Sequence, residues 1–113
     1  MSGRSPTTDE ARLLAELARI AGIEHPEAWV ENLRVQEMDD GGMGSLEFDV
    51  PKILPGGRYA AHYRAAVQFT DADGVPVIAS LVVREDGVPF ELDIWKVDSN
   101  GLIRIPYEFQ RTE

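Results

Sequence analysis

The chain has 113 residues, of which 43% are hydrophobic and 27% charged, and it has no cysteine. This length and composition predict one globular domain over residues 1–113, and they argue against disorder and against a disulfide scaffold. Without cysteine there can be no thiolate metal site and no cysteine nucleophile. No apolar run approaches the roughly 20 residues of a membrane span, and residues 1–6 are too polar to begin a secretion signal. We therefore expect a cytoplasmic protein of bacterial type.

Net charge narrows the range of partners. Twenty acidic residues against eleven basic ones leave a net charge of −9, and the basic residues are scattered singly along the chain. Nucleic acids and anionic membranes need a clustered positive field, so neither is expected as a partner. Two interpretations of the charge stay open: it serves solubility, or it attracts a basic protein partner.

Two helices are predicted at the start of the chain, after residues 1–7, which we expect to fray. Thr7 and Glu10 form a capping box, and apolar residues at helical spacing extend a helix over residues 8–21. Gly22 suits the left-handed position that ends such a helix. His25-Pro26 begins a shorter helix with an apolar stripe at Trp29, Val30 and Leu33.

After Leu33 the apolar residues recur at every second position, as in strands. The predicted strands cover residues 33–37, 45–50, 58–70, 75–85, 90–97 and 102–107. Alternation places Tyr63 with Val67 and Phe69 on the core face, and His62 on the opposite face. Short turns favour antiparallel neighbours. The predicted fold class is α+β, with two N-terminal helices packed on one face of a curved, roughly six-stranded antiparallel meander.

Catalytic and metal-binding motifs are weak. The serines lie outside any nucleophile elbow, and His25 and His62 are isolated. Residues 71–74 resemble half a calcium loop, but a hairpin turn explains Asp71, Asp73 and Gly74 equally well. The glycines at 41–44 could cradle an anion, although a turn is the simpler interpretation. We expect no cofactor and no metal.

Acidic residues two apart on strands are the more informative pattern. Glu91 and Asp93 share one strand face with Trp95, and Glu47 and Asp49 form a second such pair. Paired carboxylates can act as acid and base, but alternation of this kind is also typical of a solvent-facing strand. Tryptophan beside carboxylates is typical of a protein-binding hot spot. The predicted partner-binding residues are Glu91, Asp93, Trp95, Asp98, Asp39 and Asp40. For Trp95 one alternative stays open, that it seals a small second core beneath residues 51–57.

Three segments carry a family resemblance. They are Phe90–Asp98, with the letters E-L-D-I-W-K-V-D, then Met38–Leu46, with M-D-D-G-G-M-G-S-L, and Phe69–Val77. Together they resemble a small bacterial family of domains of unknown function. The chain departs from that family's pattern after Asp98, where Ser99-Asn100-Gly101 replaces an aromatic residue followed by Ser-Pro. The resemblance implies a compact bacterial domain with no assigned catalytic residues.

Three functional hypotheses follow from these patterns. The first is a non-enzymatic acidic binding protein, such as an immunity or antitoxin-like inhibitor of a basic bacterial toxin. The second is an enzyme or small-ligand-binding domain that uses a pocket on the curved sheet near His62, with Tyr59, Tyr63 and Arg64 as further lining residues. Since alternation separates the tyrosines from His62, such a pocket requires a bulge in the strand. The third is a homodimer formed by edge-strand pairing, because the predicted strand 102–107 carries Arg104 and Pro106, which are typical of an edge.

Overall fold

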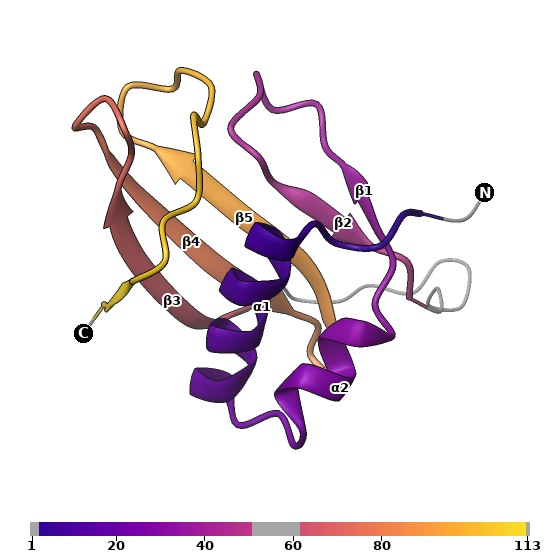
Figure 1. Cartoon of the computed structure of the whole chain (residues 1–113). Helices are drawn as coiled ribbons and strands as arrows, with labels where there is room; N and C mark the ends of the chain where they lie inside the picture. Colours follow the sequence, from indigo (N-terminus) through magenta and orange to yellow (C-terminus); the bar gives the residue numbers. More distant parts are fainter. Residues whose placement is uncertain (1–2, 51–61, 113) are drawn as a thin grey trace.

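The computed structural model describes residues 3–50 and 62–112. Two helices precede six strands. The helices are α1 (Thr8–Ala21) and α2 (Pro26–Glu31), and the strands are β1 (Val35–Glu37), β2 (Leu46–Phe48), β3 (His62–Thr70), β4 (Pro76–Val83), β5 (Pro89–Lys96) and β6 (Gln110–Arg111). Both helices lie on the same face of the sheet (Figure 1). The predicted α+β class, with two helices and six antiparallel strands, is confirmed. No helix within the described ranges is long and apolar enough to cross a membrane.

Helix α1 begins and ends as its sequence predicts. The Thr7 hydroxyl accepts a hydrogen bond from the Glu10 amide, and the Glu10 carboxylate accepts one from the Thr7 amide. Gly22 ends the helix with φ of 83°, a left-handed conformation that glycine adopts without strain. Its buried residues, Leu13, Leu14, Leu17 and Ala18, face the sheet. These caps and this apolar stripe fix how α1 covers the core.

Helix α2 is short and begins at an unusual residue. His25 precedes it in the left-handed region, with φ of 52°, and its side chain makes no capping hydrogen bond. Pro26 occupies the first turn, where a missing N–H costs nothing. Trp29 then packs edge-on against Phe48 of β2, with 5.8 Å between the ring centroids. The helix is thus anchored to the sheet by an aromatic contact.

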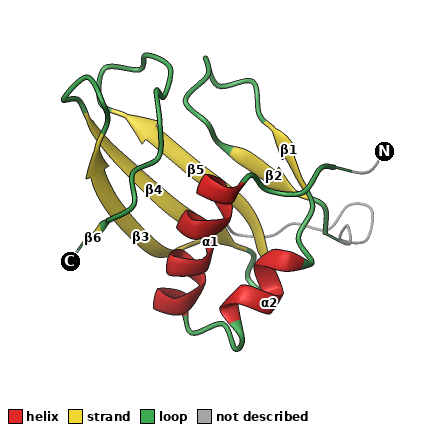
Figure 2. Cartoon of the chain, in the orientation of Figure 1, coloured by secondary structure: helices red, strands yellow, loops and turns green. Residues whose placement is uncertain are grey.

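The strand order across the sheet is β1-β2-β5-β4-β3-β6, and every neighbouring pair is antiparallel (Figure 2). The predicted meander is therefore limited to β3, β4 and β5. The β1–β2 hairpin joins the far side of β5, and β6 returns to the free edge of β3. These two non-sequential pairings are the departure from a simple meander.

Alternation along the strands separates a core face, which packs against the helices, from an outer face. On the core face, Leu46, Leu92, Leu81 and Ala65 form one row across four strands, and all four are buried. Ile94 belongs to the same buried set. Alternation predicts that Phe90, Leu92 and Ile94 face the helices; Leu92 and Ile94 are buried in the core, whereas Phe90 is half-buried and lies outside that core set. Glu91, Asp93 and Trp95 lie on the outer face.

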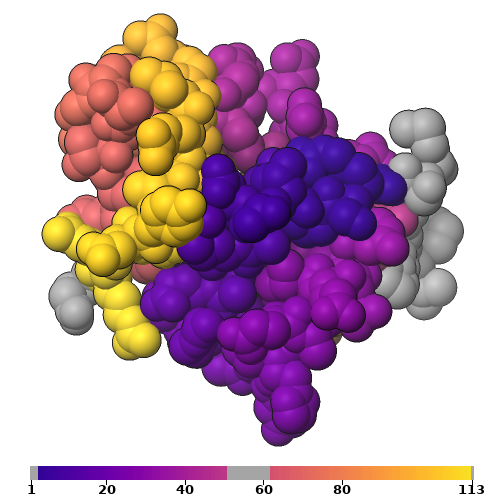
Figure 3. All heavy atoms as spheres, viewed as in Figure 1, coloured from indigo at the N-terminus to yellow at the C-terminus, as the bar shows by residue number. Residues whose placement is uncertain are grey.

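The predicted strand at residues 102–107 is wrong. This segment lies against α1 instead (Figure 3). The last strand pairing is made by β6 with β3. Arg12 of α1 donates hydrogen bonds to the carbonyls of Ile105, at 3.1 Å, and Pro106, at 2.8 Å, and its guanidinium lies over the Tyr107 ring. Pro106 has no N–H to donate to a strand ladder. The carbonyls of Ile105 and Pro106 accept hydrogen bonds from the side chain of Arg12, in place of those that a neighbouring strand would donate.

The expectation that residues 1–7 fray is also incorrect for the described part of this segment. Arg4 forms a two-hydrogen-bond bridge with Val35 of β1, at 2.9 and 2.8 Å. The Arg4 guanidinium also binds the carboxylates of Glu10 and Glu37. Gly3 lies so close to the Val35 backbone that a Cβ atom would collide with it. The start of the chain therefore extends the sheet beyond β1.

Candidate functional site

Acidic and aromatic side chains gather on the outer face of the sheet. The register pairs Glu47 of β2 with Glu91 of β5, and Glu91 with Val82 of β4. Asp93 lies opposite Ser80, and Trp95 opposite Ile78. We call the set of Glu47, Glu91, Asp93, Tyr63 and Trp95 the acidic outer face.

Tyr63 joins this face because β3 contains a bulge. The register shifts between Tyr63 and Ala65, so that Arg64 has no partner on β4 and Tyr63 lies opposite Val82. The side chain of Tyr63 is 69% exposed, and its hydroxyl donates a hydrogen bond to Asp93 at 3.3 Å. The prediction that Tyr63 faces the core is therefore wrong, since one inserted residue moves all preceding side chains to the other face.

The carboxylates of the acidic outer face repel one another. Burial raises the pKa of Glu91 above its usual value, and the neighbouring charges of Asp93 and Glu47 raise it further. The charge of Asp93 is also the main cause that raises the pKa of Tyr63. Within residues 3–50 and 62–112, no lysine or arginine forms an ion pair with Glu47, Glu91 or Asp93. A cation from outside would relieve this repulsion.

Trp95 is 46% exposed and borders a groove on this face. The groove has a volume of about 440 Å³ and lies between the β1–β2 connection and the side chain of Tyr63. Its lining residues from the connection are Asp40, Met43 and Ser45; those from β4 and β5 include Ser80 and Asp93. The position of Trp95 on the solvent side of β5 is as predicted. The alternative that it seals a core beneath residues 51–57 concerns a segment outside the described residues.

The other predicted binding residues lie in turns. Asp40 accepts hydrogen bonds from the amides of Met43, at 3.1 Å, and Ser45, at 2.9 Å. Burial opposes ionisation of Asp40, but these N–H groups outweigh it and lower its pKa. Asp98 accepts hydrogen bonds from Asn100 in the next turn, and Asp39 is exposed. Asp40 and Asp98 thus stabilise turns, and of the two only Asp40 also lines the groove.

The sequence reasoning missed a buried ion cluster around Lys96. This lysine is fully buried on the core face, and its ammonium donates to Asp71 at 2.8 Å, to Asp73 at 2.7 Å and to the Gly101 carbonyl at 3.0 Å. Its three N–H donors are therefore all satisfied. Strand alternation in the sequence could have predicted the burial of Lys96, because it places Lys96 on the same face as Leu92 and Ile94.

Asp71 is the hub of this cluster. Besides Lys96, it accepts hydrogen bonds from the amides of Ala72, Ile103 and Arg104. Burial alone would raise the pKa of Asp71, but these hydrogen bonds lower it to about 2. The hydrogen bonds to Asp71 and Asp73 raise the pKa of Lys96. The cluster holds the β3–β4 turn against residues 101–104.

The histidines gain no chemical role from the fold. His62 is exposed at the start of β3, and no carboxylate within the described ranges makes a hydrogen bond to it. Among these residues no group of three or more histidine, aspartate and glutamate side chains could hold a metal ion. The geometry therefore directs attention to the acidic outer face.

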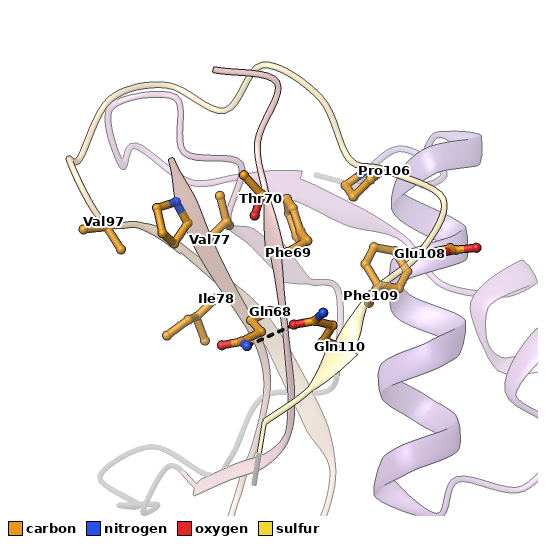
Figure 4. A pocket seen from close by; sticks show the side chains of 11 residues that line it. Gln68, Phe69, Thr70, Val77, Ile78, Val97, Pro106, Glu108, Phe109 and Gln110 are labelled. Carbon is orange, nitrogen blue, oxygen red and sulfur yellow. Dashed lines mark hydrogen bonds between the residues drawn. The ribbon is translucent and has the colours of Figure 1, made fainter. Parts of the chain in front are cut away.

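A second concavity, of about 530 Å³, lies where the C-terminal segment meets β3 (Figure 4). Gln68 of β3 donates a hydrogen bond to Gln110 of β6 across one side of it. Phe69 and Phe109 pack against each other with 5.9 Å between their ring centroids. These contacts attach the C-terminal segment to the sheet. The concavity lies next to them, between this segment and β3.

Comparison with known proteins gives a family but no characterised relative. No curated protein and no solved structure matches the chain. One family model matches residues 3–106, and thus nearly the whole chain, including the three segments with the E-L-D-I-W-K-V-D and M-D-D-G-G-M-G-S-L patterns. The chain therefore belongs to the family described as "Domain of unknown function (DUF6984)".

Proposed function

We propose that this protein is a non-enzymatic binding protein whose acidic outer face receives a basic protein partner. The observation that carries the proposal is the set of Glu47, Glu91 and Asp93 beside the exposed rings of Tyr63 and Trp95. These carboxylates form no ion pair with a described residue, and burial together with repulsion by Asp93 and Glu47 raises the pKa of Glu91. Folding brings these carboxylates together at a cost, and a cationic surface would recover that cost on binding. The aromatic rings add rigid apolar area of the kind that anchors protein interfaces.

Inhibition of a basic bacterial toxin is the form of binding that this proposal favours. An acidic inhibitor with a net charge of −9 is attracted to a cationic substrate groove over a long range, which raises the association rate. The outer face of the sheet would then cover that groove. The support is electrostatic and geometric, and the partner is identified here by its chemistry alone.

Charge reversal with a matched control tests the proposal. The probe is a hexalysine peptide, whose affinity is measured by calorimetry at low salt. The double variant Glu91→Lys/Asp93→Lys should lose most of the binding. The double variant Glu24→Lys/Glu31→Lys changes the net charge equally, but of its two exposed residues Glu31 ends α2 and Glu24 precedes it. The control should therefore retain most of the affinity, and equal losses in the two variants would contradict the proposal.

A further inference from the structure

The groove on the acidic outer face contains a polar side chain that has no hydrogen-bond partner among the described residues. Ser80 of β4 is only 7% exposed and lines the groove. Its hydroxyl makes no hydrogen bond to any residue in the described ranges. In these ranges, every side-chain oxygen or nitrogen that is shielded from solvent has a hydrogen-bond partner. The Ser80 hydroxyl has none, so it is not shielded and must open into the groove that Ser80 lines. Ser45 in the opposite wall differs from Ser80, because it is buried and its hydroxyl forms hydrogen bonds with the backbone of Ile94.

Because the Ser80 hydroxyl opens into the groove, a ligand group seated there can hydrogen-bond to it in place of water. Asp93 lies directly opposite Ser80 on β5, and one of its carboxylate oxygens accepts the bond from Tyr63. A carboxylate has about four acceptor sites, so most of the capacity of Asp93 is unused. The groove therefore presents two neighbouring acceptors, one charged and one neutral.

The remaining walls determine what kind of cation fits. Trp95 and Tyr63 both border the groove and keep large exposed areas, at 46% and 69%. Aromatic faces attract cations, and they stack best on a planar one. Asp40 in the opposite wall adds negative charge, although its oxygens are occupied by backbone amides. A volume of about 440 Å³ lies within the range of small-ligand sites, about 300–1,000 Å³.

We infer that this groove binds the guanidinium of an arginine side chain that the basic partner presents. Arginine offers five N–H donors in a plane, so one edge can reach the carboxylate of Asp93 while another N–H reaches the Ser80 hydroxyl. Lysine offers a compact ammonium, which cannot stack on a ring and meet both acceptors in the same way. The inference rests on the proposed function, since it names the side chain that the acidic outer face selects.

Three capped tripeptides test the inference. They are acetyl-Gly-Arg-Gly-amide and the same peptide with lysine or with citrulline in the middle, each titrated into ¹⁵N-labelled protein and followed by NMR. The arginine peptide should shift the Trp95 indole and the Ser80 amide in a saturable way, and the indole of Trp29 should not move. We expect it to bind about tenfold more tightly than the lysine peptide. Citrulline keeps the shape but lacks the charge, and should not bind.

Two variants complete the test. Ser80→Ala should lower the ratio of the affinities for the arginine and lysine peptides toward one. Ser5→Ala, which changes an exposed serine near the start of the chain, should leave this ratio unchanged. If Ser80→Ala does not fold, Asp93→Asn serves instead and should abolish saturable binding of the arginine peptide. Amide spectra of each variant report whether the fold is retained.

The outcomes separate this inference from the proposed function. Equal affinity for the arginine and lysine peptides, shifts away from the groove, or no saturable binding would overturn the arginine site. In those cases hexalysine binding that still depends on Glu91 and Asp93 would leave the proposed function intact. Conversely, a selective arginine site together with hexalysine binding that ignores those carboxylates would refute the broader proposal alone.

Discussion

On the outer face of β5, Trp95 exposes 46% of its surface next to Glu91 and Asp93, while Leu92 on the same strand is fully buried. This difference predicts opposite results for two substitutions. Trp95→Ala should leave the melting temperature nearly unchanged and cost about 2 kcal/mol of binding to a basic partner. Leu92→Ala, as the control, should cost about 2–5 kcal/mol of stability. A large fall in the melting temperature of the Trp95 variant would show that this side chain is structural.

Glu91 should oppose folding at neutral pH. Its pKa is raised above 4.5 by burial and by Asp93 and Glu47, so the folded state retains this proton to a higher pH than the unfolded chain. Stability therefore falls as the pH rises through the region just above 4.5. Glu91→Gln removes this loss and should stabilise the protein by about 0.5 kcal/mol at pH 7. Thermal melts should show that the gain disappears below about pH 4, and a constant gain would contradict the account.

Asp71 should have the opposite effect. Its pKa is lowered to about 2, from 3.8, so the stability that it contributes is complete above 3.8 and is lost as the pH falls toward 2. Asp71→Ala leaves the ammonium of Lys96 with fewer acceptors in a buried site and should cost about 3 kcal/mol at pH 7. Denaturant unfolding at pH 7 and at pH 2 measures both effects. An equal cost at both pH values would show that the charge of Asp71 is not responsible.

At the scale of elements, the helices and the core face followed directly from the sequence. The Thr7 and Glu10 capping box and Gly22 define α1, because such caps depend only on neighbouring residues. The alternation of Leu92 and Ile94 likewise identified the buried side of β5. Local patterns were sufficient where the deciding interactions are local.

The errors concern interactions between distant residues. Tyr63 moved to the outer face through a bulge whose register depends on pairing with β4. Residues 102–107 bind Arg12, over 90 positions away, instead of forming a strand. For the candidate site, Glu91, Asp93 and Trp95 were identified, and Tyr63 was considered only as a lining residue of a pocket near His62. Ser80 was not identified, because only the folded sheet brings it to the same groove.

The Ser45 hydroxyl is one of the groups that hold the connection between β1 and β2 against β5. Ser45 accepts a hydrogen bond from the Ile94 amide at 2.8 Å and donates one to the Ile94 carbonyl at 3.2 Å, and so continues the pairing of β2 with β5 beyond Leu46. Ser45→Ala leaves both backbone groups buried and unpaired and should cost about 1–3 kcal/mol. Hydrogen exchange should show faster exchange of the Ile94 amide. Unchanged exchange there would contradict this role.

At the scale of the whole molecule, charge pairing differs between the two faces. Cations pair with carboxylates at the N-terminus, along α1, at the β4–β5 turn and in the buried cluster; these are Arg4, Arg12, Arg19, Arg84 and Lys96. The carboxylates of the acidic outer face have no such partners within the described ranges. Carboxylates without an ion pair among the described residues also lie elsewhere, at Glu24 and Glu31 for example, but Glu47, Glu91 and Asp93 lie together beside exposed aromatic rings. Binding on the outer face should weaken as salt is added.

The most direct measurement is the location of a bound cationic peptide. Hexalysine is titrated into ¹⁵N-labelled protein, and the amide shifts are mapped at low and at physiological salt. The account predicts the largest shifts at Glu47, Glu91, Asp93 and the Trp95 indole, with smaller shifts as the salt rises. Shifts that centre on α1 and α2, or that spread evenly over all exposed carboxylates, would contradict the claim that the outer face of the sheet is the binding surface.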